Sequence, residues 1–540
     1  MSDRRVTAER WLAAEPDDDV RAELVELLTG DPAILDERFA KGLSFGTAGL
    51  RAAIGAGPSR MNRLVVRRAA AGLVDHLLAS RPDAAERGLL IACDARRKSA
   101  DFALDTARVA AARGVRAILI EGTTPTPVLA FNVARLGVAA GVMVTASHNP
   151  REDNGYKVYL GHGAQIIPPH DVAIAERIDA LDATTIEVVE PDHPLIERLG
   201  DEPTAAYLEW LPAVRRRPDV TGVRVGYTAM HGVGGAVVAR AFARCGLPAP
   251  VVVEAQQSPD ANFPTVAFPN PEEPGAMDMV IALGLREGLD VVIANDPDAD
   301  RLGVAVRTDD GFRLLRGDEI GWLFADHILR HTSGDDRLVV TTVVSSSLLA
   351  DMAAAHGVEC RETFTGFKWI AQAALDARDR RLVFAYEQAL GYLVADRPLD
   401  KDGVAAAVVM AELAATAVAE GTTIVGRLDA IAERFGRHLT AERSVHMEPS
   451  AGAALVRSLT ANPPTTIGGR PVVAVHEFTE ANLLRLWLDE EGGRGVRLQV
   501  RPSGTEPKVK IYGEAVDAPA GMLDRLLDAL VALIDATSGR

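Results

Sequence analysis

The chain has 540 residues, 48% of them hydrophobic, and a formal net charge of −17. A chain of this length is too long to fold around one hydrophobic core, and three or four domains are predicted. The acidic balance argues against nucleic acid or an anionic membrane as a main partner, because both bind clustered lysine and arginine. No apolar stretch reaches the ~20 residues needed to cross a bilayer. Three widely spaced cysteines favour a reduced, cytoplasmic protein.

Residues 1–40 predict a helical extension, with Val20, Leu24 and Leu28 on one face. Helices and strands then alternate with short links, a pattern typical of layered α/β sheets. The alternation restarts near residues 223 and 317, whereas the tail has mostly strands and one amphipathic helix, which indicates an α+β domain. The predicted units are the extension at 1–40, domain I at 41–203, domain II at 204–312, domain III at 313–434 and domain IV at 435–540.

The first candidate site is the stretch around Ser147. Residues 136–144 form an apolar run that predicts a buried strand, and Thr-Ala-Ser-His-Asn-Pro follows it. Ser147 is therefore expected in a stiff loop at a strand end, where ligands of α/β sheets bind. Asn154-Gly155 predicts a second tight turn before a strand that begins at Tyr156.

A phosphorylated serine carries roughly −1.5 to −2 charges and needs cations close by. His148 and Lys157 are the nearest candidates along the chain, and Arg51 follows a small-residue turn suited to an anion. The alternative is an ordinary serine in a strand-to-loop turn.

A second candidate site is formed by Asp296, Asp298 and Asp300, which directly follow an apolar strand at 291–294. Carboxylates at alternate positions suit a hard divalent cation such as Mg²⁺, and without a cation they repel each other. Arg301 follows at once and is a candidate bridge between the metal and an anionic substrate. A solvated acidic turn is the alternative.

A third candidate site is Arg501-Pro-Ser-Gly-Thr-Glu-Pro. Its guanidinium, its two hydroxyls and the backbone N–H groups that a glycine leaves accessible offer many donors to a phosphate. The alternative is a plain turn. Together with Ser147 this makes two phosphate sites, which suit a small molecule that is phosphorylated at one end and reacts at the other.

Four motifs carry a resemblance to a known family: residues 145–157, the loop 296–301, the loop Glu-Gln-Ala-Leu-Gly-Tyr at 387–392 and the loop 501–507. In this order they resemble the α-D-phosphohexomutase superfamily of phosphoglucomutases and phosphomannomutases. Residues 262–272 and the aspartate loop look most like the branch with phosphoglucomutase-2 and phosphopentomutase. The resemblance implies a heart-shaped α/β enzyme with three similar mixed-sheet domains, a C-terminal α+β domain and a central active site.

The resemblance also implies roles for individual residues. Ser147 would be the phosphoserine and would hold Mg²⁺ together with the three aspartates. Lys157, a candidate general acid/base, and Arg51 would lie beside the reacting phosphate. The implied substrate-binding residues are Arg301, Lys368, Glu387, Arg501, Ser503, Gly504 and Thr505.

The implied reaction moves a phosphoryl group between C1 and C6 of a glucose or mannose phosphate, with glucose 1,6-bisphosphate as intermediate and activator. In many hexose-specific members a serine stands two places after the glutamate and a histidine ends the loop, whereas this chain has Ala389 and Tyr392, with Leu390 as an extra residue. A phosphopentomutase acting on ribose or deoxyribose phosphates therefore stays open, as do a sugar-bisphosphate synthase and a non-catalytic phosphosugar-binding protein. We expect a small phosphosugar as the partner and a monomer or dimer.

Overall fold

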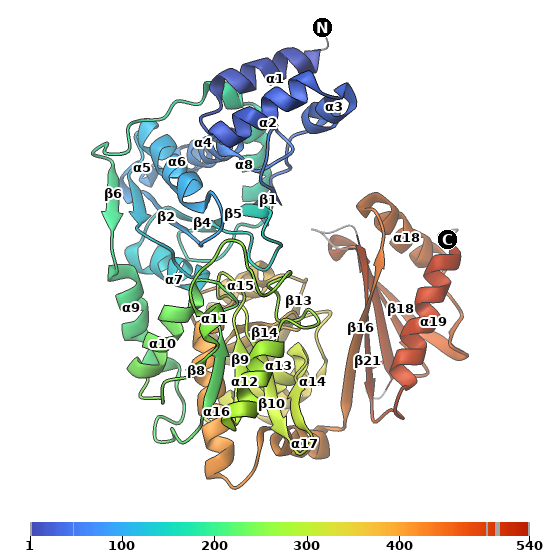
Figure 1. Cartoon of the computed structure of the whole chain (residues 1–540). Coiled ribbons are helices and arrows are strands. Elements are labelled where there is room, and N and C mark those ends of the chain that lie inside the picture. The colour runs from blue at the N-terminus through green and yellow to red at the C-terminus, as the bar shows by residue number, and fades with distance from the viewer. Residues whose placement is uncertain (1–2, 47, 493–494, 503–507, 538–540) are drawn as a thin grey trace.

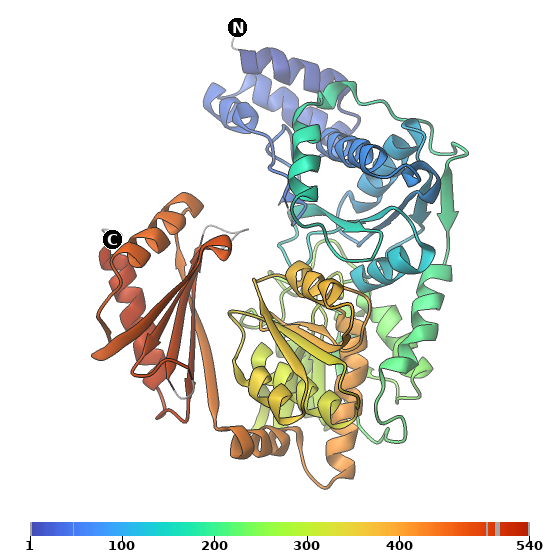
Figure 2. The same cartoon turned by 180° about the vertical axis from the view of Figure 1, so that it is seen from behind.

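The computed structural model describes residues 3–46, 48–492, 495–502 and 508–537. Three α/β units lie against one another, and the C-terminal unit stands to one side of them (Figures 1 and 2). Among the described residues no single helix is long and apolar enough to cross a membrane; α16 (Gly403–Ala419) and α17 (Ile424–Phe435) pass that test only as a pair, bent by 83°. The three cysteines are free thiols, two of them buried.

Three N-terminal helices share the hydrophobic core of domain I through buried leucine, valine and aromatic side chains. They are α1 (Asp3–Ala14), α2 (Asp18–Thr29) and α3 (Pro32–Ala40). The predicted face of the second helix is buried, because Val20, Leu24 and Leu28 lie in the domain I core.

Domain I is a mixed six-stranded sheet in the order β1-β5-β4-β2-β3-β6, in which β5 runs antiparallel to both of its neighbours. Its strands are β1 (Leu50–Ala53), β2 (Leu89–Cys93), β3 (Ala117–Ile120), β4 (Ala140–Val144), β5 (Asp153–Leu160) and β6 (Ile196–Leu199). Its helices are α4 (Arg63–Ser80), α5 (Ala84–Arg87), α6 (Ser99–Ala112), α7 (Thr126–Leu136) and α8 (His170–Asp179), with a 3-10 turn at Ala183–Thr185.

Two local predictions in this domain were wrong. The strand expected from residue 136 begins at Ala140, because α7 continues to Leu136 and ends at Gly137, whose φ is 65°. Asn154-Gly155 is not a turn but lies inside β5, which begins at Asp153. Gly155 pairs with Arg51, and a Cβ on it would meet the carbonyl oxygen of Thr145 at 2.5 Å. The glycine therefore permits close backbone packing.

Domains II and III repeat the same plan with fewer strands. Domain II has the order β11-β10-β9-β7-β8 and domain III β13-β12-β14-β15. The strands are β7 (Val225–Thr228), β8 (Val251–Val252), β9 (Val291–Ala294), β10 (Gly303–Thr308), β11 (Gly311–Leu314), β12 (Arg337–Thr342), β13 (Glu359–Thr363), β14 (Arg381–Glu387) and β15 (Gly391–Leu393). The helices are α9 (Glu202–Trp210), α10 (Gly234–Arg244), α11 (Glu254–Gln257), α12 (Asp278–Glu287), α13 (Gly317–Arg330), α14 (Leu348–Ala355), α15 (Phe367–Asp376), α16 (Gly403–Ala419) and α17 (Ile424–Phe435), with a 3-10 turn at Leu211–Val214.

The Ser147 loop, the aspartate loop and the Glu387 loop occupy equivalent places in domains I, II and III. Each joins a strand to the antiparallel strand after it: β4 to β5, β9 to β10 and β14 to β15. Each therefore lies at the carboxyl end of a central strand, where ligands of such sheets bind. Equivalent loops of three adjacent domains meet at one site.

Domain IV is a wholly antiparallel sheet in the order β16-β21-β20-β19-β18-β17, with α18 and α19 on its outer face (Figure 1). Its strands are β16 (His438–His446), β17 (Thr466–Ile467), β18 (Arg470–Phe478), β19 (Leu483–Leu488), β20 (Val496–Pro502) and β21 (Lys508–Val516). Its helices are α18 (Pro449–Ala461) and α19 (Met522–Thr537), with a 3-10 turn at Thr479–Ala481.

The four units are held together unequally. One hydrophobic core runs from Val128 of domain I through Tyr227 of domain II to Phe384 of domain III. Domain IV has its own core and contributes Leu483 and Tyr512, with the partly buried Phe478 and Ala481, to a small apolar cluster with domain III. The first three domains are therefore one packed body, to which the fourth is attached by a limited interface.

Candidate active site

Ser147 lies in the β4–β5 loop with its hydroxyl directed at domain II. Its φ of 54° is in the left-handed region, which a residue other than glycine occupies only when its surroundings enforce it. The Ser147 N–H donates to Thr145 Oγ1 at 2.8 Å, and Ser147 Oγ donates to Asp296 Oδ2 at 3.0 Å. The first two predicted sites thus form one site.

The shape of this loop is imposed by Arg96, a residue that the sequence analysis missed. Arg96 Nη2 donates to the carbonyl oxygens of Ser147 and Asn149, both at 2.6 Å. Nη1 donates to the carbonyl oxygens of Pro150 at 2.7 Å and Asp153 at 3.2 Å. One guanidinium therefore binds the backbone of the whole loop.

Arg96 is itself held from two sides. Its Nε lies 3.3 Å from Asp94 Oδ2, and both side chains are 1% exposed. On the other side the guanidinium lies 5.1 Å from the ring centre of Phe263 in domain II. The sequence did contain a signal for this contact. The charged residues Asp94 and Arg96 follow β2 closely, and because β2 and β4 are neighbouring parallel strands, the segments after them lie side by side.

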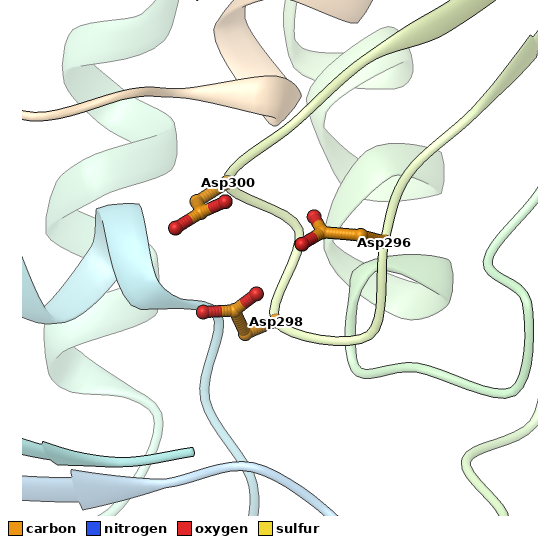
Figure 3. Close-up of side chains that lie close together, drawn as sticks. All are labelled: Asp296, Asp298 and Asp300. Carbon is orange, nitrogen blue, oxygen red and sulfur yellow. The ribbon is translucent and has the colours of Figure 1, made fainter. Parts of the chain in front are cut away.

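Asp296, Asp298 and Asp300 converge from the single loop between β9 and β10 (Figure 3). All three are fully buried, and Ala299 between them has a φ of 56°. Thr126 Oγ1 of domain I donates to Asp298 Oδ2 at 2.7 Å, which joins the loop to α7. The tight turn presents three carboxylates toward one point.

These carboxylates fit a divalent cation. One oxygen from each lies within 4.8 Å of the others, and Oδ1 of Asp298 and of Asp300 has no hydrogen-bond partner. Burial, and then the charges of Asp298 and Asp300, raise the pKa of Asp296 well above its usual value. Oxygen-only donors with an unmet need for positive charge are typical of sites for hard cations such as Mg²⁺.

Two lysines supply positive charge beside the triad. Lys157 Nζ donates to Asp298 Oδ2 at 2.7 Å and to Asp300 Oδ2 at 3.0 Å. Burial would lower the pKa of Lys157, but the two carboxylates outweigh it and raise that pKa. Lys401 Nζ of domain III lies 3.2 Å from Asp300 Oδ2. Both lysines are therefore held as cations.

Lys401 was not identified from the sequence. Its neighbour Asp400 accepts from Tyr159 OH and Gln165 Nε2 of domain I, both at 2.8 Å. Asp402 accepts from the Ala405 N–H and caps α16. The run Asp-Lys-Asp-Gly before an apolar helix was a recognisable N-cap, but nothing local indicated that the lysine would reach a metal loop.

Arg51, Arg301 and His148 also lie close to the Ser147 loop. Arg51 Nη1 donates to Asn149 Oδ1 at 3.0 Å, and the Arg301 N–H donates to Asp296 Oδ1 at 3.0 Å. His148 Nδ1 lies 3.3 Å from Ser147 Oγ. Burial, then the charges of Arg301 and Arg51, lower the pKa of His148 well below its usual value, so its imidazole is neutral.

The predicted sugar loop is fastened to domain II. Arg301 Nη1 donates to the Ala389 carbonyl at 3.0 Å, and the Leu302 N–H donates to the Leu390 carbonyl at 3.1 Å. Glu387 ends β14 and is 7% exposed. Tyr392 is fully buried, and its hydroxyl donates to the Gly317 carbonyl at 3.0 Å. The Tyr392 side chain is therefore part of the hydrophobic core.

Lys368 and Arg501 bring domains III and IV to the same region. Burial lowers the pKa of Lys368 to about 8; the charge of Asp171 opposes this shift, whereas that of Arg501 adds to it. Arg501 lies near the end of β20. The predicted ligands Ser503, Gly504 and Thr505 lie outside the described residues.

Comparison with known protein families accounts for this architecture. Residues 42–185, 205–311 and 316–435 match the phosphoglucomutase/phosphomannomutase alpha/beta/alpha domains I, II and III. Residues 487–531 match the C-terminal domain of the same family. The chain belongs to the phosphoglucomutase/phosphomannomutase family. It is a phosphomutase, an isomerase that transfers phosphate, as the sequence predicted.

Relatives in the phosphoglucomutase/phosphomannomutase family carry several names. A probable phosphomannomutase of Haemophilus influenzae is 39% identical over 474 residues, 86% of this chain and 95% of the relative. A phosphopentomutase of Homo sapiens is 34% identical, over 94% of this chain and 91% of that protein. A human glucose 1,6-bisphosphate synthase is 32% identical, over 98% of this chain and 92% of the relative.

Solved structures confirm the predicted fold. The putative phosphomannomutase of Thermus thermophilus matches with a TM-score of 0.72 at 22% identity, over 92% of this chain and 99% of that chain. This match and the four family matches show the four-domain architecture of the phosphoglucomutase/phosphomannomutase family. The three aspartates form a group that could hold a metal ion.

Proposed function

We propose that the protein is a phosphosugar mutase in which Ser147 carries the transferred phosphoryl group. The bond from phosphorus to Ser147 Oγ breaks as the group passes to a free hydroxyl of a sugar monophosphate, and a sugar bisphosphate forms. The bisphosphate then reverses its orientation in the site. Its other phosphoryl group passes to Ser147 Oγ, and the isomeric monophosphate leaves. The observation that carries the proposal is Ser147 Oγ on a strained turn, 3.0 Å from Asp296.

Each transfer also moves a proton. In the first transfer it passes from the attacking sugar hydroxyl to Ser147 Oγ, and in the second it passes back to the leaving sugar oxygen. We assign Lys157 to this exchange: its ammonium group would give a proton to Ser147 Oγ as the phosphoryl group leaves and regain one from the attacking sugar hydroxyl, and the second transfer would run in the opposite direction. His148 is neutral beside Ser147 Oγ and supports the same exchange as a hydrogen-bond partner.

Charge around the phosphoryl group comes from cations on three domains. Mg²⁺ would be held by Asp296, Asp298, Asp300 and the phosphate of Ser147, and would neutralise charge during transfer. Arg51 and Arg301 flank the same place. The substrate's second phosphate would bind Arg501, Ser503, Gly504 and Thr505, and Glu387 with Lys368 would bind its sugar.

Among sugars, we propose a pentose phosphate exchanged between C1 and C5. Ala389 supplies no hydroxyl, Tyr392 is bound to Gly317 and Gln388 is bound to Ser345, so Glu387 is the main polar side chain that this loop offers. A sugar with fewer hydroxyls needs fewer such partners. Relatives named phosphopentomutase in Homo sapiens and probable phosphoribomutase in Schizosaccharomyces pombe, 34% and 35% identical, support this choice.

A hexose phosphate exchanged between C1 and C6, the first preference predicted from the sequence, is the second candidate. The Haemophilus influenzae relative named probable phosphomannomutase supports it. We place the enzyme in the cytoplasm because free thiols persist there.

The test is turnover of ribose 1-phosphate, glucose 1-phosphate and mannose 1-phosphate by the purified protein, with Mg²⁺ and a trace of glucose 1,6-bisphosphate. We expect the highest kcat/KM with ribose 1-phosphate, and loss of phosphate from Ser147 by mass spectrometry when sugar phosphate is added. A hexose preference would replace the pentose assignment and keep the mechanism. Full turnover by Ser147→Ala would refute the mechanism itself.

A further inference from the structure

Arg301 lies between two carboxylates of its own domain, Glu272 and Asp300. Its Nη1 is 3.8 Å from Glu272 Oε2, and its Nε is 4.0 Å from Asp300 Oδ1. Burial would lower the pKa of Arg301, but the charge of Glu272, followed by that of Asp300, raises it. The guanidinium is therefore a permanent cation that two carboxylates attract to different places.

Asp300, one of the three converging aspartates (Figure 3), has one occupied and one unoccupied oxygen. Its Oδ2 accepts from Lys157 at 3.0 Å and lies 3.2 Å from Lys401 Nζ. Its Oδ1 and the Nε of Arg301 are both buried, and within the part of the chain that the structure describes neither has a hydrogen-bond partner. Oδ1 is therefore the oxygen that Asp300 has left for a divalent cation.

Arg301 Nε is a potential competitor for this oxygen. An N–H···O hydrogen bond has a donor–acceptor distance of about 2.7–3.2 Å, so a movement of Arg301 by about 1 Å would join its Nε to Asp300 Oδ1. A guanidinium bound there would take one of the three carboxylates from the cation. Something must hold Arg301 back, because the attraction between these two buried charges is otherwise unopposed.

The other end of the guanidinium supplies this restraint. Nη1 donates to the Ala389 carbonyl of the Glu387 loop at 3.0 Å, and the same nitrogen is the one nearest to Glu272. The backbone of Arg301 also forms a bridge with Gly391. A carbonyl is only a neutral acceptor, whereas Glu272 brings a full negative charge to this end of the side chain. The carboxylate therefore adds the larger attraction toward the Glu387 loop.

The backbone around Glu272 fixes the position of its carboxylate. Asn270 is buried, and its Oδ1 accepts from the Glu272 N–H at 3.1 Å, which closes a local turn. Pro271 packs against Gly303 at the start of β10, where a Cβ on the glycine would meet the Pro271 Cβ at 2.6 Å. The loop is thus attached to the strand that follows Arg301, and Glu272 keeps its distance from the guanidinium.

We propose that Glu272 is a positioning residue that holds Arg301 on the Glu387 loop and keeps it from taking Asp300 Oδ1 from the divalent cation. The inference rests on the proposed function in one respect, because it takes the three aspartates as the cation site. Without the carboxylate of Glu272, Arg301 moves toward Asp300. Cation binding then weakens, and the Glu387 loop loses its hydrogen bond at Ala389.

The test is the binding of Mn²⁺, a paramagnetic cation that carboxylates also ligate, measured by electron paramagnetic resonance on the purified full-length protein without sugar. Glu272→Gln keeps the size of the side chain and removes its charge. We expect its Kd for Mn²⁺ to rise about tenfold, and its KM for the preferred sugar phosphate to rise as well. Glu273→Gln is the matched control, because it removes the same charge from the neighbouring exposed residue, and its Kd should stay within twofold of the parent value.

A second background decides whether Glu272 acts through Arg301. Arg301→Met removes the competitor, so adding Glu272→Gln to it should change the Kd less than twofold, and the double variant should bind Mn²⁺ about as tightly as the parent. Equal weakening by Glu272→Gln in both backgrounds would overturn the inference, because the carboxylate would then act only by its charge or on the fold. An unchanged Kd in Glu272→Gln would overturn it too.

Failure of the proposed function gives a different result. A parent protein that binds Mn²⁺ but turns over no sugar phosphate would refute the proposed function alone, because the binding comparison needs no turnover. A parent protein that binds no Mn²⁺ would refute the cation site and this inference with it. Glu272→Ala, at a side chain that is 35% exposed, repeats the comparison should the glutamine variant fail to fold.

Discussion

Replacement of Arg96 by methionine tests whether the Arg96 side chain determines the conformation of the Ser147 loop. The change keeps the apolar stem but removes four hydrogen bonds to loop carbonyls and the ion pair with Asp94. Removing one partner of a buried ion pair costs about 3–5 kcal/mol. Burial already raises the pKa of Asp94, so this carboxyl can take up a proton, and we expect a loss of about 3 kcal/mol.

The effect on activity should exceed the effect on folding. A displacement of about 1 Å costs roughly 10²-fold in rate, so kcat of Arg96→Met should fall by about that factor. Turnover measures the loss of rate, and thermal unfolding measures the loss of stability. The phosphorylation level of Ser147 measures whether the serine still takes up the phosphoryl group. Arg97→Met is the control, because that side chain is 53% exposed and lies 3.9 Å from Asp19. A folded Arg96→Met enzyme with kcat within twofold of the parent would refute the reasoning.

Three other predictions concern charge. Asp298→Asn should weaken Mg²⁺ binding at least tenfold and turnover with it, whereas the exposed Asp310→Asn should not; an unchanged metal titration would contradict the assignment. Chelation by EDTA should abolish turnover and lower Tm, because the triad carboxylates then repel each other, and Mg²⁺ should restore both. Since the pKa of Lys368 is lowered to about 8, its positive charge is lost as pH rises through that value. The kcat/KM should therefore fall between pH 7 and 9, and Lys368→Arg should move the fall to higher pH; identical profiles would count against Lys368 as a substrate contact.

Much of the candidate site was predictable because its residues follow local rules. Ser147 and Asp296 each come directly after a run of apolar residues, and a run of that kind ending in turn formers predicts a strand end. Local rules also produced the error at Asn154-Gly155, a dipeptide typical of turns. Pairing of Gly155 with Arg51, more than a hundred residues earlier in the chain, outweighed this local preference.

By itself the sequence determined the alternation of helices and strands, the loops that bear Ser147 and the three aspartates, and, through the order of its motifs, the family. The roles of Arg96, Lys401 and Glu272 were decided by tertiary structure alone. Each acts on a segment distant in sequence or in another domain: Arg96 on the loop after β4, Lys401 on the loop after β9, and Glu272 on Arg301 at the end of that loop. Local composition sets which element a segment forms, but strand order and domain packing set which side chains meet, and those depend on the whole chain.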